Sequence, residues 1–148
     1  MGIVNQGMRF VGPAILPKVS HHRNLVDSYT KFFINERVEE KTVLYESRDG
    51  QSMTDSPLAI FEYLLQMDKD MAYTHIWSIT KNDELEVIKQ RYEDRRNVLF
   101  VYRNSKDYLK WLAKAEFLIN NSTFQSFVTI KENQTYINTW HGTPLKTM

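Results

Sequence analysis

Hydrophobic positions along this chain change period several times, and the changes predict an alternation of strands and helices. Short runs rich in β-branched and aromatic residues predict five strands, at residues 42–46, 75–79, 98–102, 117–121 and 135–140. Between these runs, apolar residues recur at helical spacing, as Leu58, Phe61 and Leu65 do. Strands joined by helices are typical of β-α-β units, so we expect an α/β fold: a Rossmann-like parallel sheet with flanking helices.

Local patterns refine this expectation. The run at 98–102 is apolar throughout and predicts a strand that is buried on both faces of the sheet. The run at 135–140 also predicts a short buried strand. Asp83 and Glu86 have the spacing of a capping box, which predicts the start of a helix at this point.

The region before the first predicted strand is organised differently. Residues 22–41 have a mixed helical pattern, whereas the preceding residues predict an irregular start because glycines and prolines interrupt their apolar positions. We therefore divide the 148-residue chain into an N-terminal lead segment with one helix (1–41) and a Rossmann-like domain (42–148). Charges of both signs on the lead helix favour a solvated face over a membrane anchor.

Composition narrows the class of partner. A net charge of +1 gives no argument for nucleic-acid binding, and 42% hydrophobic residues fit a globular domain. The absence of cysteine excludes disulfides and thiolate metal sites and suits a reducing compartment.

No window has the length of a transmembrane helix and no signal-peptide pattern is convincing, so we expect a cytoplasmic protein, with peripheral contact to the inner face of the membrane left open. We expect no metal and no cofactor, because the histidines lack metal-ligand spacing and G-x-G-x-x-G and P-loop motifs are absent.

The most informative motif is H-G-T-P-L-K at residues 141–146, directly after the last predicted strand. Gly142 breaks the strand, Thr143 is a good N-cap, and the following proline suits the first helical position. The imidazole of His141 would then lie beside free backbone N–H groups, a helix dipole and Lys146, which suits a phosphate-bearing ligand next to a titratable base. Plainer alternatives remain for both residues. His141 could be hydrogen-bonded at the strand end without a chemical role, and Lys146 could be a solvated lysine. Because the chain ends two residues later, we expect an incomplete active site.

Two further polar loops follow the first and fourth predicted strands. Ligands of parallel sheets bind beyond the carboxyl ends of the strands, so these loops supply further candidates for substrate contacts. The candidates are Ser47, Arg48, Gly50 and Asn121. A simple turn at Ser47 and Gly50, and a cap or turn at Asn121, remain the plainer interpretations.

Several motifs occur in an order and spacing that resemble a known family. They are Y-E-S-R-D-G (45–50), T-D-S-P (54–57), T-H-I-W (74–77), N-S-K-D-Y (104–108) and Q-T-Y-I-N-T-W-H-G-T-P-L-K (134–146). From about residue 42 to its end, the chain resembles the CDP-glycerol glycerophosphotransferase family, the teichoic acid polymerases and primases of Gram-positive bacteria. The resemblance implies the N-terminal, acceptor-side half of a GT-B fold, in which the active site lies between two Rossmann-like halves.

The same resemblance implies an activity: transfer of glycerol phosphate from CDP-glycerol to a hydroxyl of a teichoic-acid-type polymer, with release of CMP. By position, His141 takes the role of the catalytic base, while Lys146 and the N–H groups after Gly142 neutralise phosphate oxygens. The turn at residues 47–50 is expected to hold the phosphodiester of the acceptor polymer, with Arg48 binding it in a bidentate way. The donor is expected to bind mainly to a second half that this chain lacks.

Departures from the family pattern leave alternatives open. The pair Arg48-Asp49 is more charged than the family pattern leads us to expect, so the identity of the acceptor stays open. We expect the fragment alone to be inactive, since the second half and its catalytic histidine are missing. A non-catalytic Rossmann-like remnant or binding module remains an alternative, as does a family member that acts on ribitol phosphate or a capsular polymer.

Overall fold

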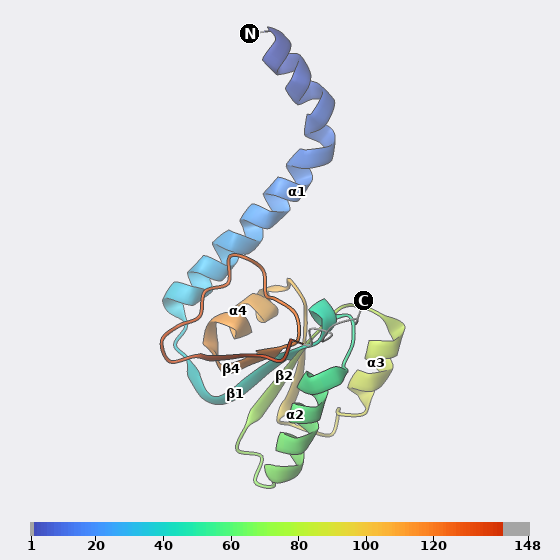
Figure 1. Cartoon of the computed structure of the whole chain (residues 1–148), viewed down its shortest axis with the longest axis vertical. Coiled ribbons are helices and arrows are strands. Elements are labelled where there is room, and N and C mark those ends of the chain that lie inside the picture. Colours follow the sequence, from blue (N-terminus) through green and yellow to red (C-terminus); the bar gives the residue numbers. More distant parts are fainter. Residues whose placement is uncertain (1, 141–148) are drawn as a thin grey trace, which may run out of the picture.

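The computed structural model describes residues 2–140, with side chains from residue 18 onward. Within this part, the chain forms one five-stranded parallel sheet in the order β3-β2-β1-β4-β5 (Figure 1). The strands are β1 (Glu39–Glu46), β2 (Thr74–Ile79), β3 (Val98–Tyr102), β4 (Ala115–Asn120) and β5 (Thr135–Asn138). The helices are α1 (Gly2–Asn35), the short 3-10 helix η1 (Arg48–Gly50), α2 (Asp55–Met67), α3 (Asp83–Gln90) and α4 (Lys106–Lys114). The predicted α/β class and parallel sheet are confirmed.

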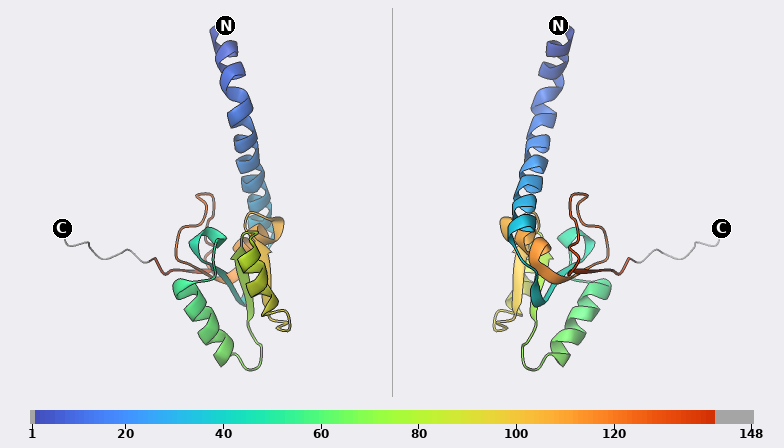
Figure 2. Two further views of the ribbon diagram at one scale, coloured as in Figure 1. Left: turned by 90° about the vertical axis from the view of Figure 1, so that its right-hand side faces the viewer. Right: turned by 90° about the vertical axis from the view of Figure 1, so that its left-hand side faces the viewer.

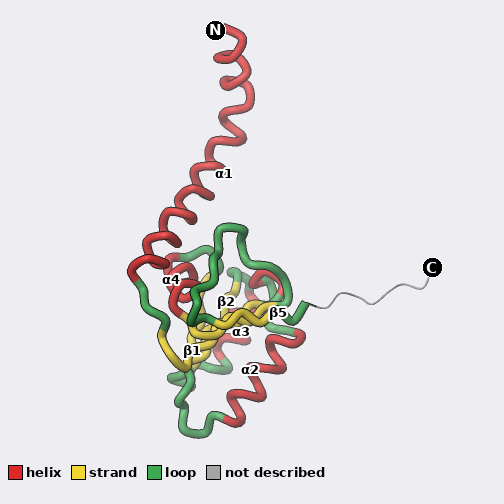
Figure 3. Tube along the Cα trace, turned by 60° about the vertical axis from the view of Figure 1, so that its left-hand side comes forward, coloured by secondary structure: helices red, strands yellow, loops and turns green. Residues whose placement is uncertain are grey.

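Helices cover both faces of the sheet, and each face has its own apolar core. On one face, α4 and the C-terminal part of α1 pack against Leu44, Ile76 and Leu118. On the other face, α2 and α3 pack against Tyr45 and Trp77. Leu44 and Tyr45 are neighbours that point to opposite faces, as strand geometry requires. Figure 3 shows α2 and α4 on opposite sides of the strands.

Helix α1 extends beyond the rest of the fold, and its N-terminal part projects away from the sheet (Figures 1 and 2). Its C-terminal part is anchored by Tyr29, whose hydroxyl donates to the Thr129 carbonyl at 2.7 Å and accepts from the Thr129 N–H at 3.1 Å. The predicted irregular start is wrong, because the backbone is already helical at Gly2 and stays helical through the prolines that interrupt the pattern. The helix also ends before residue 41, because Glu39 already pairs with Ala115 of β4.

The burial predicted for the third and fifth strands is wrong. β3 forms one edge of the sheet, where Val98 and Val101 are buried but Leu99 is exposed. β5 forms the other edge, and its residues are all exposed, Tyr136 and Ile137 among them. An apolar run predicts a strand but not its place in the sheet, because strand order decides which strands lie at the edges.

The helix caps near the carboxyl edge of the sheet agree only in part with the sequence pattern. Asn82, rather than Asp83, is the N-cap of α3, since its side chain accepts from the Leu85 N–H at 3.0 Å. Glu86 does not complete a capping box, because its carboxylate accepts a hydrogen bond from the Tyr102 hydroxyl at the end of β3. Helix α4 is capped by Ser105, whose hydroxyl accepts from the Tyr108 N–H at 3.2 Å.

Candidate functional site at the carboxyl edge of the sheet

The loops that follow β1 and β4 meet at the carboxyl edge of the sheet. Glu46, at the end of β1, is the register partner of Ser78 in β2 and of Asn120 in β4. The strand order changes direction between β1 and β4, and α/β sheets bind ligands at such switch points. The structure brings two predicted site residues into contact there, because the Arg48 N–H donates to Asn121 Oδ1 at 2.9 Å.

The turn after β1 has a left-handed backbone. Arg48, Asp49 and Gly50 have φ angles of 47°, 57° and 79°. Residues other than glycine disfavour this conformation, at a cost on the order of 1–3 kcal/mol for each residue. Two backbone hydrogen bonds close the turn, from the Gly50 N–H to the Ser47 carbonyl at 3.0 Å and from the Gln51 N–H to the Arg48 carbonyl at 3.1 Å. The surroundings must therefore hold these residues in place.

Contacts from neighbouring strands fix the end of this turn. The Gly50 carbonyl accepts hydrogen bonds from the N–H and the hydroxyl of Thr80, at 2.7 and 3.2 Å. Gly50 is itself buried, and a Cβ added to it would lie 3.3 Å from Cδ of Arg103. Glycine is therefore favoured at this position both by the backbone angle and by the space available.

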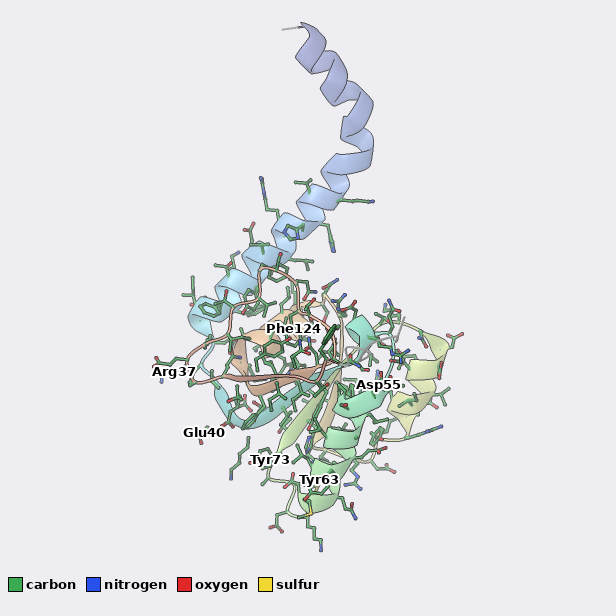
Figure 4. The ribbon with its side chains drawn as sticks, in the orientation of Figure 1. Arg37, Glu40, Asp55, Tyr63, Tyr73 and Phe124 are labelled. Carbon is green, nitrogen blue, oxygen red and sulfur yellow. The ribbon has the colours of Figure 1, made fainter. Side chains whose placement is uncertain are left out.

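A first polar cluster surrounds the turn on the α2 side of the sheet, and we call it the α2-side cluster. It consists of Ser47, Arg48, Thr54, Asp55 and Asn121. Buried Ser47 donates to the Thr54 carbonyl at 3.1 Å and accepts from Asn121 Nδ2 at 3.3 Å. Asp55 Oδ2 lies 3.2 Å from Asn121 Nδ2 and 3.1 Å from Arg48 Nε, while the Arg48 side chain is 60% exposed. Asp55 is the first residue of α2 and is labelled in Figure 4.

A second polar cluster lies on the other side, and we call it the α4-side cluster. It consists of Glu46, Asp49, Ser78, Arg103 and Ser122. Glu46 is fully buried and its Oε2 accepts from the Ser78 hydroxyl at 2.8 Å. Arg103 Nε lies 3.4 Å from the same oxygen, and Arg103 Nη2 lies 3.3 Å from Asp49 Oδ1. The Ser122 hydroxyl also donates to Asp49 Oδ1, at 3.0 Å. Side chains from the ends of four strands thus converge on the turn.

Burial and Arg103 together set the charges of the α4-side cluster. Burial raises the pKa of the Glu46 carboxyl, and the Arg103 guanidinium opposes this rise. Burial lowers the pKa of Arg103, but Glu46, Tyr108 and Asp49 together raise it above its ordinary value, so the guanidinium stays protonated. The Tyr108 hydroxyl faces the same pair, and burial raises its pKa well above the ordinary value. Arg103 is therefore the positive charge that balances this cluster.

The end of β5 is tied to the end of β4. The carbonyl of Asn120 accepts from the N–H of Thr139 at 2.7 Å and from its hydroxyl at 3.1 Å. Asn120 Oδ1 also accepts from the Tyr136 hydroxyl at 2.8 Å. The residues just before the H-G-T-P-L-K motif therefore lie beside the turn after β1. The motif residues named as candidates lie outside the described residues, so their roles stay predictions: His141, Gly142, Thr143 and Lys146.

Sequence reasoning missed the α4-side cluster. Glu46 ends β1 and Arg103 directly follows β3, which are positions where parallel strands present side chains to a ligand. That position is the signal by which they could have been found. Among the side chains that the structure describes, no three histidine, aspartate or glutamate residues are arranged to hold a metal ion. None of the described helices has both the length and the apolar character needed to cross a bilayer.

Comparisons with known proteins agree on one family. A family model for CDP-glycerol:poly(glycerophosphate) glycerophosphotransferase matches residues 28–148. The teichoic acid poly(glycerol phosphate) polymerase of Staphylococcus epidermidis is 35% identical over 139 residues, which cover 94% of this chain and 18% of that protein. The protein of the same name from Bacillus spizizenii is 36% identical over 107 residues, or 72% of this chain and 26% of that protein.

Solved structures show the same relationship. The wall teichoic acid polymerase TagF matches with a TM-score of 0.63 and 28% identity, over 96% of this chain and 32% of that chain. A TagF variant soaked with CDPG matches with the same TM-score and 27% identity, over 86% of this chain and 31% of that chain. The chain thus spans less than a third of the length of each of these relatives. The predicted fold, a Rossmann-like domain of a GT-B enzyme, is confirmed by this match. The chain therefore belongs to the CDP-glycerol:poly(glycerophosphate) glycerophosphotransferase family, as its motifs predicted.

Proposed function

We propose that this chain supplies the acceptor-side half of a glycerophosphotransferase. The whole enzyme transfers glycerol phosphate from CDP-glycerol to a hydroxyl of a teichoic-acid-type polymer and releases CMP. One observation carries the proposal: the turn after β1, the loop after β4 and the end of β5 converge at the carboxyl edge of the sheet, directly before the H-G-T-P-L-K motif. The names of the relatives support the choice of reaction.

Arg48 is the residue of the turn that we assign to the phosphodiester of the acceptor. Its Nε lies 3.1 Å from Asp55 Oδ2, and its side chain is 60% exposed. A guanidinium binds the paired oxygens of a phosphodiester in a bidentate way, which a lysine does not. Asn121 lies beside it, but its amide is buried and paired with Arg48, Ser47 and Asp55, so we propose that it positions Arg48. Ser47 and Gly50 are buried, so we propose that they maintain the shape of the turn and make little contact with the polymer.

The chemistry belongs to the motif that follows β5. In the proposed reaction, His141 takes the proton of the acceptor hydroxyl while the oxygen attacks the phosphorus that carries glycerol. The bond from this phosphorus to the CMP oxygen breaks, and CMP leaves. Such general-base assistance is worth about 10²–10⁴-fold in rate. Lys146 and the N–H groups of Gly142 and Thr143 balance the negative charge that gathers on the phosphate oxygens.

The cellular setting follows from the proposed substrates. CDP-glycerol is a nucleotide-activated donor, so we propose a cytoplasmic enzyme that extends a polymer at the inner face of the membrane, in peripheral contact with it. A second candidate function is a module that binds the polymer without catalysis. It is favoured by the contacts among Ser47, Arg48 and Asn121, which give the turn a fixed shape.

A titration followed by NMR tests the proposal on the 148-residue chain. A glycerol-phosphate trimer and CDP-glycerol are added separately, and the amides of residues 47–50 and the ring of His141 are observed. The proposal predicts shifts at both places with the trimer, and the loss of those shifts in Arg48→Ala. Arg37→Ala is the matched control, since Arg37 is exposed and lies away from Asp55 (Figure 4). Shifts at the turn with a silent His141 favour the binding module, and silence at both places contradicts both functions.

A further inference from the structure

Arg103 connects three residues that shape the turn after β1. It follows β3 directly, and its N–H donates to the Ile79 carbonyl at the end of β2, at 2.8 Å. From this position, its guanidinium lies 3.4 Å from Glu46 Oε2 and 3.3 Å from Asp49 Oδ1. Its Cδ also lies directly beneath Gly50, 3.3 Å from where a Cβ would be. A single side chain therefore contacts the residue before the turn, its centre and its end.

We propose that Arg103 is a positioning residue, which holds residues 48–50 in the left-handed conformation that presents Arg48 to the acceptor polymer. The inference rests on the proposed function of the turn. A device of this kind is needed because Arg48 and Asp49 both have positive φ angles, which their side chains disfavour. Backbone hydrogen bonds like those that close the turn also occur in ordinary turns, so they do not select the left-handed form by themselves. Arg103 and Ser122 both hold the Asp49 carboxylate, and these contacts are made with the turn in its left-handed form.

Arg103 also pairs with the negative charge of Asp49, which lies next to Arg48 in the chain. Asp49 is the immediate neighbour of Arg48, and a free carboxylate at this point would repel the phosphodiester that Arg48 is assigned to bind. The structure turns Asp49 toward Arg103 and Ser122, so its negative charge is paired within the α4-side cluster. Arg48 instead pairs with Asp55 on the other side of the sheet. The turn thus separates its two charged side chains.

Glu46 keeps Arg103 in place. Its buried carboxyl is fixed by the Ser78 hydroxyl, and the guanidinium lies against the same oxygen. Arg103 Nε is outside hydrogen-bond geometry with this oxygen, so the contact is ionic rather than a directed bond. The contacts of Arg103 named here are all at the carboxyl edge of the sheet. We therefore expect its loss to loosen the turn and to leave the strands intact.

Amide hydrogen exchange of the ligand-free chain tests the positioning role directly. Arg103→Met is compared with Arg103→Lys and with Arg96→Met, which changes an exposed arginine before β3. In Arg103→Met, the amides of Gly50 and Thr80 should exchange about tenfold faster, while that of Leu118 in β4 stays protected. Arg103→Lys should restore part of the protection, and Arg96→Met should behave as the parent. Unchanged exchange at Gly50 and Thr80 overturns the proposal.

Binding of the glycerol-phosphate trimer gives a second readout, which separates this inference from the proposed function. If the parent binds the trimer, Arg103→Met should raise the Kd by about tenfold, because the turn is no longer preorganised. If the parent does not bind it but the turn still loosens in Arg103→Met, the proposed function fails and the positioning role stands. If the Leu118 amide also loses protection in Arg103→Met, the whole sheet is destabilised, and exchange is then measured in Asp49→Asn instead. Faster exchange at Gly50 in Asp49→Asn supports the proposal, and unchanged exchange overturns it.

Discussion

The carbonyl oxygen of Asn120 accepts two hydrogen bonds from Thr139, one from the backbone N–H at 2.7 Å and one from the hydroxyl at 3.1 Å. This double contact fixes the end of β5 against the end of β4, and Asn121 follows directly. The last described residues before the motif are therefore held beside the turn that we assign to the acceptor. Groups mounted on neighbouring strand ends keep their separation, which is the condition for placing a base against a bound hydroxyl.

The first prediction concerns His141. In an enzyme made by joining this chain to the remainder of the Staphylococcus epidermidis polymerase, His141→Ala should lower kcat by about 10²–10⁴-fold, because the general base is lost. Transfer of labelled glycerol phosphate into polymer measures the effect. His21→Ala, which changes an exposed histidine of α1, should leave kcat unchanged. A kcat for His141→Ala within about tenfold of the parent would remove His141 from the mechanism.

The second prediction concerns Asn121, which joins the turn to β4. Asn121→Ala leaves the Arg48 N–H without its acceptor and removes the donor to Ser47 Oγ. We expect the free energy of unfolding to fall by about 2 kcal/mol, because a part-buried donor is left unpaired. Urea denaturation measures this change. Asn133→Ala, at an exposed loop position, should have almost no effect, and equal losses in the two variants would contradict the assignment.

The third prediction concerns Gly50, with its φ angle of +79°. Gly50→Ala places a Cβ against Arg103 and forces an alanine into the left-handed region, so the free energy of unfolding should fall by about 1–2 kcal/mol. Thermal denaturation should then show a Tm lower by about 2–8 °C for a domain of this size. The neighbouring Gln51 has a φ angle of −80°, so Gln51→Ala should leave the Tm unchanged. A Gly50→Ala protein as stable as its parent would show that the turn can relax.

The fourth prediction concerns the pH dependence of stability. His75 is fully buried, with its Nδ1 2.9 Å from the Tyr45 hydroxyl. Burial lowers the pKa of His75 from its ordinary value of 6.5, and the charge of Asp68 opposes this only in part. The unfolded chain therefore takes up a proton more readily than the folded chain. The contribution of His75 to the free energy of unfolding is present above pH 6.5 and is lost as the pH falls below it.

Urea denaturation of the parent and of His75→Gln, on both sides of pH 6.5, isolates this contribution. The difference between the two curves cancels the other titrating groups. As the pH falls, the parent should lose stability relative to His75→Gln. A difference that does not change with pH would mean that the folded chain protonates His75 as readily as the unfolded chain does.

Strand positions could be predicted from the sequence, but the place of each strand in the sheet could not. The apolar run at 98–102 coincides with β3, because β-branched and aromatic side chains favour extended backbone. Its exposure at Leu99 depends on β3 being an edge strand, and this follows from the order of all the strands. The same holds for β5. Local pattern therefore gives the elements, while topology gives their burial.

The candidate site was predictable to the same extent. Polar loops after the first and fourth strands predicted a shared ligand site, and the contact of Arg48 with Asn121 joins these loops. The left-handed form of the turn was not predicted, because Ser-Arg-Asp-Gly is compatible with ordinary turns. Nor was the partner of Asp49, since Arg103 is 54 residues away and approaches only when β3 is in place.

The tryptophans give this chain an optical reporter at the proposed site. Trp140 is 72% exposed and directly precedes the motif. Trp77 is buried in a stack with Tyr45, and Trp111 is partly covered by Lys114, whose Nζ lies 4.3 Å from the ring centroid. A water-soluble quencher of fluorescence therefore reaches Trp140 more readily than the other two. A polymer that settles beside His141 should shield Trp140 from the quencher, so light emitted by an unlabelled chain can report when the site is occupied.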